Sequence, residues 1–141
     1  MKYLKYIVLT LLMLISIAMG AEAKTVKAKH MYMFGFAASF KDSVVYMTEI
    51  QDVKDAMYDT KSKFLLGRDS YSDQLKTYFR EKMQLSDRVC VVMFSTSKKK
   101  AEKKYLKLRK KYLSNKKHTS TYEVRYVTTQ DFEFEPVAMD E

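Results

Sequence analysis

The chain has 141 residues, a formal net charge of +9, one cysteine, three glycines and one proline. A single cysteine excludes an internal disulfide, and so little glycine and proline excludes low-complexity linkers. The apolar content of 47% is too high for a disordered chain. The length therefore predicts one globular domain with one core.

Residues 1–23 are interpreted as a signal peptide. Two lysines precede an apolar run, residues 7–19, which is shorter than a typical membrane span. Small residues follow, and they predict cleavage after Ala23, with Gly20 as the second choice. We therefore expect an exported protein, periplasmic or secreted, whose single domain 24–141 has no membrane span. The alternative is an uncleaved N-terminal anchor.

The domain is expected to begin with a basic, extended lead-in followed by two strands. In residues 31–40 the odd-numbered and the even-numbered positions are both mostly apolar, as in a strand covered on both faces. Gly35 within this strand indicates a bulge or close packing by a helix. Residues 44–53 are rich in β-branched side chains, and the two segments together predict a hairpin. Between residues 53 and 67 we expect a short helical turn around 53–59, then a loop that closes at Gly67.

Two helices and two strands complete the predicted elements. Residues 68–86 have apolar side chains at helical spacing, with Asp69 or Ser70 as the N-terminal cap. Residues 88–96 are almost wholly apolar and predict a central strand. The basic segment forms the next helix, and residues 121–135 alternate as a last strand.

The resulting order, ββαβαβ, predicts an α/β (α+β) fold. Strands separated by helices favour parallel neighbours joined by right-handed crossovers. Two crossovers of the same hand can place both helices on one side. We therefore expect a two-layer sandwich, a mixed sheet of four to five strands with two main helices on one face, ending in an acidic C-terminal tail.

Positive charge is concentrated in residues 97–117, which contain eleven Lys or Arg and one acidic residue, Glu102. One interpretation is a solvated outer helix whose narrow apolar stripe packs on the sheet. Lysines in the first turn oppose the helix dipole, however, at roughly 0.3–1 kcal/mol each. Such an uncompensated local cost is typical of functional sites. The predicted basic face comprises Lys103, Lys104, Lys107, Arg109, Lys110 and Lys111.

A candidate anion site lies where the strand 88–96 ends and the basic helix begins. Free backbone N–H groups at a helix N-terminus bind anions, and ligands of open α/β sheets sit outside the carboxyl ends of strands. Hydroxyl and ammonium groups would strengthen this site, although the glycines of a nucleotide-binding phosphate loop are missing. The candidate residues are Ser95, Thr96, Ser97, Lys98, Lys99 and Lys100.

Other chemistries have little support in the sequence. Cys90 lies among apolar residues, which predicts a buried small hydrophobe rather than a reactive thiolate. His30 and His118 stand apart in basic surroundings, so we predict no metal site, and no motif indicates a cofactor or a catalytic residue. The tyrosines fall mostly on predicted core-facing stripes, which favours core packing over nucleic-acid binding.

Three functions are consistent with these features. The preferred hypothesis is a small exported, non-enzymatic module that binds an anionic partner through the basic helix, such as anionic lipid, lipopolysaccharide or acidic polysaccharide. The first alternative is a hydrolase-type enzyme acting on an anionic or phosphorylated substrate. The second is a structural subunit of an envelope assembly, including a homo-oligomer in which the acidic tail of one copy meets the basic helix of another. The same tail would neutralise the helix if it folded back within one chain.

Overall fold

The computed structural model describes residues 24–113 and 121–138. The expected signal peptide and its cleavage site, His118 and the last three residues of the acidic tail lie outside the described residues. The described elements are β1 (Thr25–Lys27), β2 (Tyr32–Ala38), β3 (Val44–Thr48), β4 (Gln51–Asp52), β5 (Met57–Asp59), α2 (Arg68–Glu81), β6 (Val89–Ser95), α3 (Lys98–Leu113) and β7 (Glu123–Val127).

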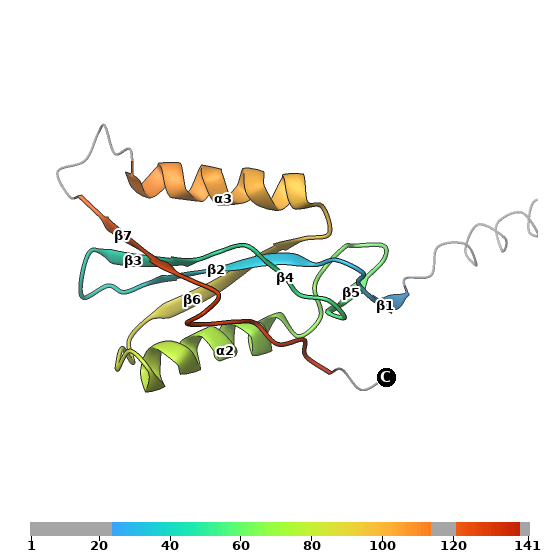
Figure 1. Cartoon of the computed structure of the whole chain (residues 1–141), viewed down its shortest axis with the longest axis horizontal. Helices are drawn as coiled ribbons and strands as arrows, with labels where there is room; N and C mark the ends of the chain where they lie inside the picture. The colour runs from blue at the N-terminus through green and yellow to red at the C-terminus, as the bar shows by residue number, and fades with distance from the viewer. Residues whose placement is uncertain (1–23, 114–120, 139–141) are drawn as a thin grey trace, which may run out of the picture.

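The main sheet has five strands of mixed direction (Figure 1). β2 lies at its centre, with β6 antiparallel along one side and β3 and β4 antiparallel along the other. β7 runs parallel to β3 on the far side. A second, two-stranded sheet joins β1 to β5. The predicted mixed sheet of four to five strands with two helices is therefore confirmed.

The helices lie on opposite faces of the sheet, and this differs from the expected arrangement with both on one face (Figure 1). An ideal Cβ on Gly35 of β2 would meet Leu75 of α2. The neighbouring Phe34 instead contacts Tyr105 of α3, with the ring centroids 5.2 Å apart. Successive strand residues point to opposite faces, so the two helices cover different sides.

The direction in which each connection steps across the sheet explains this difference. The α2 connection carries the chain from the β3–β4 side of β2 across to β6. The α3 connection carries it back from β6, past β2 and β3, to β7. Two crossovers of the same hand that step in opposite directions cover opposite faces. The prediction considered the hand of the crossovers but not their direction.

The larger core lies between the sheet and α2. Tyr71, Leu75 and Phe79 of α2 are buried, which confirms the helical stripe predicted for this segment. The helix begins at Arg68, after Gly67 in the left-handed conformation at φ 69°, and no side chain caps it. The expected cap by Asp69 or Ser70 is therefore wrong, because both residues lie inside the first turn.

A thinner layer lies under α3. Ala101 is the one residue of α3 that is fully buried. The predicted stripe continues through Tyr105, which contacts Phe34, and Tyr112, whose ring centroid lies 5.0 Å from that of Phe36. The packing of this stripe on the sheet is confirmed, and the rest of the helix surface stays exposed.

The last predicted strand, 121–135, is shorter than expected, because β7 ends at Val127. Two earlier segments also differ in conformation from the prediction. The segment around 53–59 forms no helical turn, because residues 57–59 form β5 and pair with the N-terminal lead-in strand β1. The single strand expected at 44–53 is divided into β3 and β4. Both changes come from tertiary pairing, which overrides weak local preference.

Residues 131–138, which we call the C-terminal strap, run along the α2 side of the sheet (Figure 1). Phe132 and Phe134 are buried there. The Gln51 side chain donates to the Phe132 carbonyl at 3.0 Å and accepts from the Phe134 N–H at 2.8 Å. This part of the acidic tail therefore lies across the sheet from α3 and does not neutralise the basic helix.

Candidate functional site

The candidate site lies at the carboxyl end of β6. β3 and β6 are both antiparallel to β2, so they point in the same direction and end at the same edge of the sheet. The chain beyond β3 leads to α2 on one face, and the chain beyond β6 leads to α3 on the other. Connections that depart to opposite faces open a crevice between them, which is where ligands of open α/β sheets bind.

A cavity of about 340 Å³ lies at this end of β6. One wall is the loop that follows β5, and the other is the end of β6 with the first turns of α3. The volume is at the lower end of the range for small-molecule sites. We call it the lysine cavity, and its lining residues are Ser62, Lys63, Phe64, Phe94, Ser95, Thr96, Lys100 and Lys104.

Three of the six residues predicted for the anion site line this cavity, namely Ser95, Thr96 and Lys100. Ser97 instead caps α3, because its Oγ accepts the Lys100 N–H at 3.4 Å and its carbonyl accepts the Ala101 N–H at 3.0 Å. The other two predicted residues, Lys98 and Lys99, are exposed outside the lining.

The remaining wall comes from residues that the sequence analysis did not select. Ser62, Lys63 and Phe64 belong to the loop after β5, far before Ser95 in the sequence. The run Lys61-Ser-Lys-Phe has the right residue types for anion binding. Nothing local in the sequence places it beside Ser95, however, because that proximity depends on the pairing of β5 with β1 and on the path of the chain into α2.

The loop 60–64 is held in a defined conformation by Asp59. The Asp59 carboxylate accepts the backbone N–H groups of Lys61 and Ser62, at 2.8 and 3.3 Å. The Asp59 carbonyl accepts the Lys63 N–H at 2.8 Å, and its own N–H donates to the Phe64 carbonyl at 2.9 Å. These four bonds fix the cavity wall before any ligand arrives.

Phe94 contacts one cation of the cavity, Lys104, and one cation outside its lining, Arg68. The Lys104 ammonium donates to the Phe94 carbonyl at 3.0 Å and lies 5.7 Å from the ring centroid. The Arg68 guanidinium lies 5.3 Å from the same ring. Cation–π contacts of this kind contribute about 0.5–1 kcal/mol at exposed positions. In the part of the chain that the structure describes, no ion pair engages Lys63 or Lys100.

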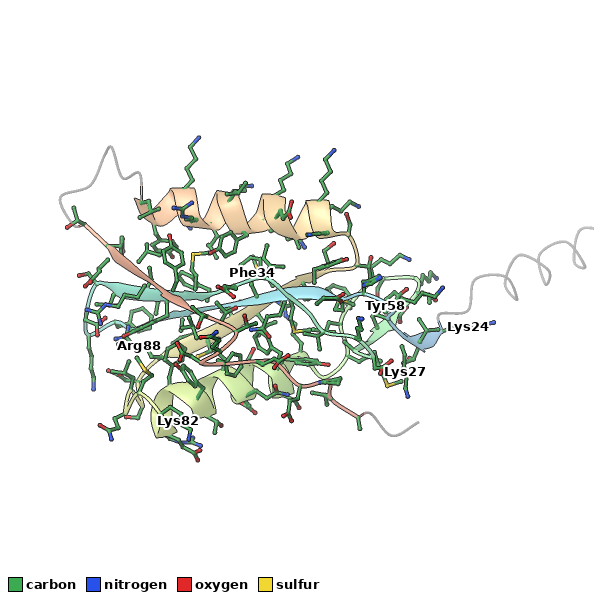
Figure 2. All side chains as sticks on the ribbon, in the orientation of Figure 1. Lys24, Lys27, Phe34, Tyr58, Lys82 and Arg88 are labelled. Carbon is green, nitrogen blue, oxygen red and sulfur yellow. The ribbon has the colours of Figure 1, made fainter. Side chains whose placement is uncertain are left out.

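The predicted basic face separates into three groups of side chains. The Arg109 Nε donates to the Tyr126 hydroxyl at 2.7 Å, and Lys111 lies over the Tyr112 ring, so these two cations rest on aromatic neighbours. Lys104 contributes to the cavity. Long nitrogen-tipped side chains also project from α3 away from the sheet (Figure 2). The exposed members of the predicted face that have no such neighbour are Lys103, Lys107 and Lys110.

Arg88 is a buried cation that the sequence analysis did not identify. It is 3% exposed and donates to both Asp42 carboxylate oxygens, at 2.9 and 2.5 Å, and to the Val44 carbonyl at 2.7 Å. The hydrogen bonds from Arg88, and then that from the Val44 N–H, lower the pKa of Asp42. This pair ties the β2–β3 hairpin to the start of β6 and lies at the end opposite Lys24 (Figure 2). We assign it a structural role.

Cys90 lies on an edge strand and not on the central strand that was predicted. β6 pairs only with β2 in the described sheet, and the Cys90 side chain is half-buried. Burial raises the pKa of the Cys90 thiol to about 11. A raised pKa disfavours the thiolate, which is the nucleophilic form.

Cys90 is therefore expected to react slowly with thiol reagents in the folded protein. The pKa of about 11, against an ordinary value of 9.0, lowers the thiolate fraction at pH 8 about a hundredfold. Stopped-flow labelling with Ellman's reagent compares the reaction rate in buffer with the rate in guanidinium, and the rate in buffer should be much lower. Equal rates in the two conditions would show instead an accessible, reactive thiol.

The fold and the cavity define a small mixed α/β domain with a cationic cavity at the end of an edge strand. Among the described residues, no helix is both long and apolar enough to span a membrane, and no three His, Cys, Asp or Glu side chains group as metal ligands would. Comparison with known family models, with curated proteins and with solved structures finds no match to this chain. Its function is therefore argued from the cavity.

Proposed function

We propose that this chain is a small exported, non-enzymatic module that binds an anionic partner at the lysine cavity. One observation carries the proposal: Lys63 from one connection meets Lys100 and Lys104 from another around a single cavity. Hydroxyl groups complete its lining, and no carboxylate is among the lining residues. A phosphate, sulfate or carboxylate group of a larger ligand matches these donors.

The convergence of these groups distinguishes the cavity from the outer surface of α3. An isolated exposed charge pair contributes only about 0–1 kcal/mol. Charge-assisted hydrogen bonds in a partly enclosed site are roughly twice as strong as neutral ones. The exposed lysines of α3, such as Lys103 and Lys107, therefore serve to attract anions over a distance, which mainly raises the association rate.

Export remains a proposal based on residues 1–23, and candidate ligands are anionic lipid, lipopolysaccharide and acidic polysaccharide. The position of the C-terminal strap supports an accessible basic helix, because the strap lies on the other face of the sheet. A hydrolase would need a general base at the cavity, and the lining residues are lysines, hydroxyl residues and phenylalanines. A subunit role has no specific observation in its favour.

The test compares two double charge reversals that change the net charge equally. Lys63→Glu with Lys100→Glu alters the cavity, whereas Lys103→Glu with Lys107→Glu alters the outer surface of α3. We expect the cavity variant to bind fluorescein-labelled heparin at least about tenfold more weakly at moderate salt. The outer variant should bind within about threefold of the wild type. Fluorescence anisotropy over a sodium chloride series measures both affinities.

Circular dichroism of each variant shows whether the fold is retained. Equal losses of heparin affinity in both variants would mean that binding depends on the total charge and not on the cavity, which would contradict the proposal. Absence of salt-sensitive binding by the wild-type protein would also contradict it, because phosphate, sulfate and carboxylate ligands all respond to ionic strength.

A further inference from the structure

The loop 60–64 presents an apolar ring directly after two cations. Phe64 is 60% exposed, although it also contributes to the lysine cavity. Lys61 and Lys63 are exposed beside it. The next residue, Leu65, is buried and bridges to Tyr58, so it anchors the base of the loop. An exposed ring on an anchored loop, preceded by two lysines, suits insertion at a charged apolar boundary.

The order of this loop lowers the cost of inserting it. The four hydrogen bonds around Asp59 and the buried Leu65 hold the backbone in place. A binding element that is already ordered loses little conformational entropy when it docks. The Asp59 carboxylate faces the backbone N–H groups of Lys61 and Ser62, so it is turned toward the loop itself.

The loop lies at the end of the domain where the described chain begins. The Lys24 N–H donates to the Thr60 hydroxyl at 3.2 Å, and the Thr60 N–H donates to the Lys24 carbonyl at 2.9 Å. Lys24 and Lys27 mark this end of the molecule, and Lys82 lies at the other end (Figure 2). The apolar run 7–19 stops shortly before Lys24 in the sequence. In the alternative in which residues 1–23 stay as an uncleaved N-terminal anchor, the loop belongs to the end of the domain that directly follows this anchor.

We propose that the loop 60–64 docks this domain on an anionic phospholipid surface, with Phe64 at the interface and a head-group phosphate in the lysine cavity. The inference rests on the proposed function, because it identifies the anionic partner of the same cavity. An apolar insertion and a basic patch are the two weak signals that together give stable attachment to a membrane. Each lysine near an anionic surface adds about fivefold in affinity.

The natural absence of tryptophan gives a direct test. Phe64→Trp places a single reporter in the loop. Phe40→Trp is the matched control, because Phe40 is 99% exposed in the turn between β2 and β3. Each variant is used as the host cell produces it, with its N-terminus read by intact mass. The probes are vesicles of phosphatidylcholine alone or mixed with phosphatidylglycerol.

We expect the indole emission of the Phe64→Trp variant to shift to the blue with the mixed vesicles and to be quenched by brominated lipid. Emission from the control variant should not change. In co-sedimentation, Phe64→Ser should weaken binding to mixed vesicles about tenfold, and Phe40→Ser should not. Because indole emission and its quenching are local readouts, a retained N-terminal segment that holds every variant on the vesicles does not mask them, and co-sedimentation is compared only between variants whose intact mass shows cleavage.

Several outcomes would overturn the inference. One is no shift for the loop reporter while heparin binding still depends on Lys63 and Lys100; the proposed function would then stand with a soluble anion or polysaccharide as the partner. A shift of equal size with pure phosphatidylcholine would exclude recognition of anionic lipid. If the wild-type protein bound neither the mixed vesicles nor heparin, the inference and the proposed function would be overturned together.

Discussion

Replacing Gly35 by valine is expected to lower the free energy of unfolding by about 3 kcal/mol or more. An ideal Cβ at this position would overlap Leu75 Cδ2 and lie 3.4 Å from Phe134 Cζ, before the two valine methyl groups are added. Leu75 is only 1% exposed, so its side chain has no open space to enter. The gain in strand propensity from valine is at most about 1 kcal/mol, and the clash therefore dominates.

A double-mutant cycle separates this clash from other effects of losing a glycine. Gly35→Ala is expected to cost about 1–2 kcal/mol in the wild-type background and close to nothing in a Leu75→Ala background, where the space is vacant. Urea unfolding followed by circular dichroism gives the four free energies. If the cost of Gly35→Ala were the same in both backgrounds, contact with Leu75 would not be its origin.

The close contact at Gly35 also shows how much of the fold was predictable. A glycine inside an apolar strand indicates a bulge or a close approach by a helix, and the structure shows the approach by α2. Apolar residues at helical spacing likewise predicted the buried stripe through Tyr71, Leu75 and Phe79. These predictions succeeded because burial imposes a local period on the sequence.

The relation of the elements to one another was less predictable. The same pattern that makes β2 apolar on both faces, with Phe34 toward α3 and Gly35 toward α2, is compatible with several strand orders. Strand order decides the direction of each crossover and hence the face that each helix covers. It also decides that β6, with Cys90, is an edge strand. No local feature of the β6 sequence indicates which strands pair with it.

The candidate site was predictable from one side only. Ser95, Thr96 and Lys100 follow an apolar strand directly, and this position in an α/β fold indicates a ligand site. Ser97 was assigned to the same site but caps the helix instead, a role that hydroxyl residues also favour. The facing wall, with Lys63 and Phe64, depends on long-range pairing that sequence spacing does not reveal.

Gln51→Ala is expected to destabilise the protein by about 2–4 kcal/mol. The Gln51 side chain is 5% exposed and satisfies both the Phe132 carbonyl and the Phe134 N–H, at 3.0 and 2.8 Å. Alanine would leave these two backbone groups buried without a partner, and each such group costs about 1–3 kcal/mol. It would also release the C-terminal strap, whose Phe132 and Phe134 complete the core under α2. Guanidinium unfolding measures the loss.

Gln74 of α2 provides a matched control for Gln51, because its side chain binds the backbone of the same strap. Its side chain donates to the Glu135 carbonyl and accepts the Glu135 N–H, both at 2.9 Å, but this pair of bonds is exposed. Water can replace the partner there, so Gln74→Ala should cost less than about 1 kcal/mol. Because the two glutamines make the same two bonds and differ chiefly in burial, the difference between the variants measures what burial adds. Equal costs would mean that burial adds nothing to the two Gln51 bonds, which would contradict this account.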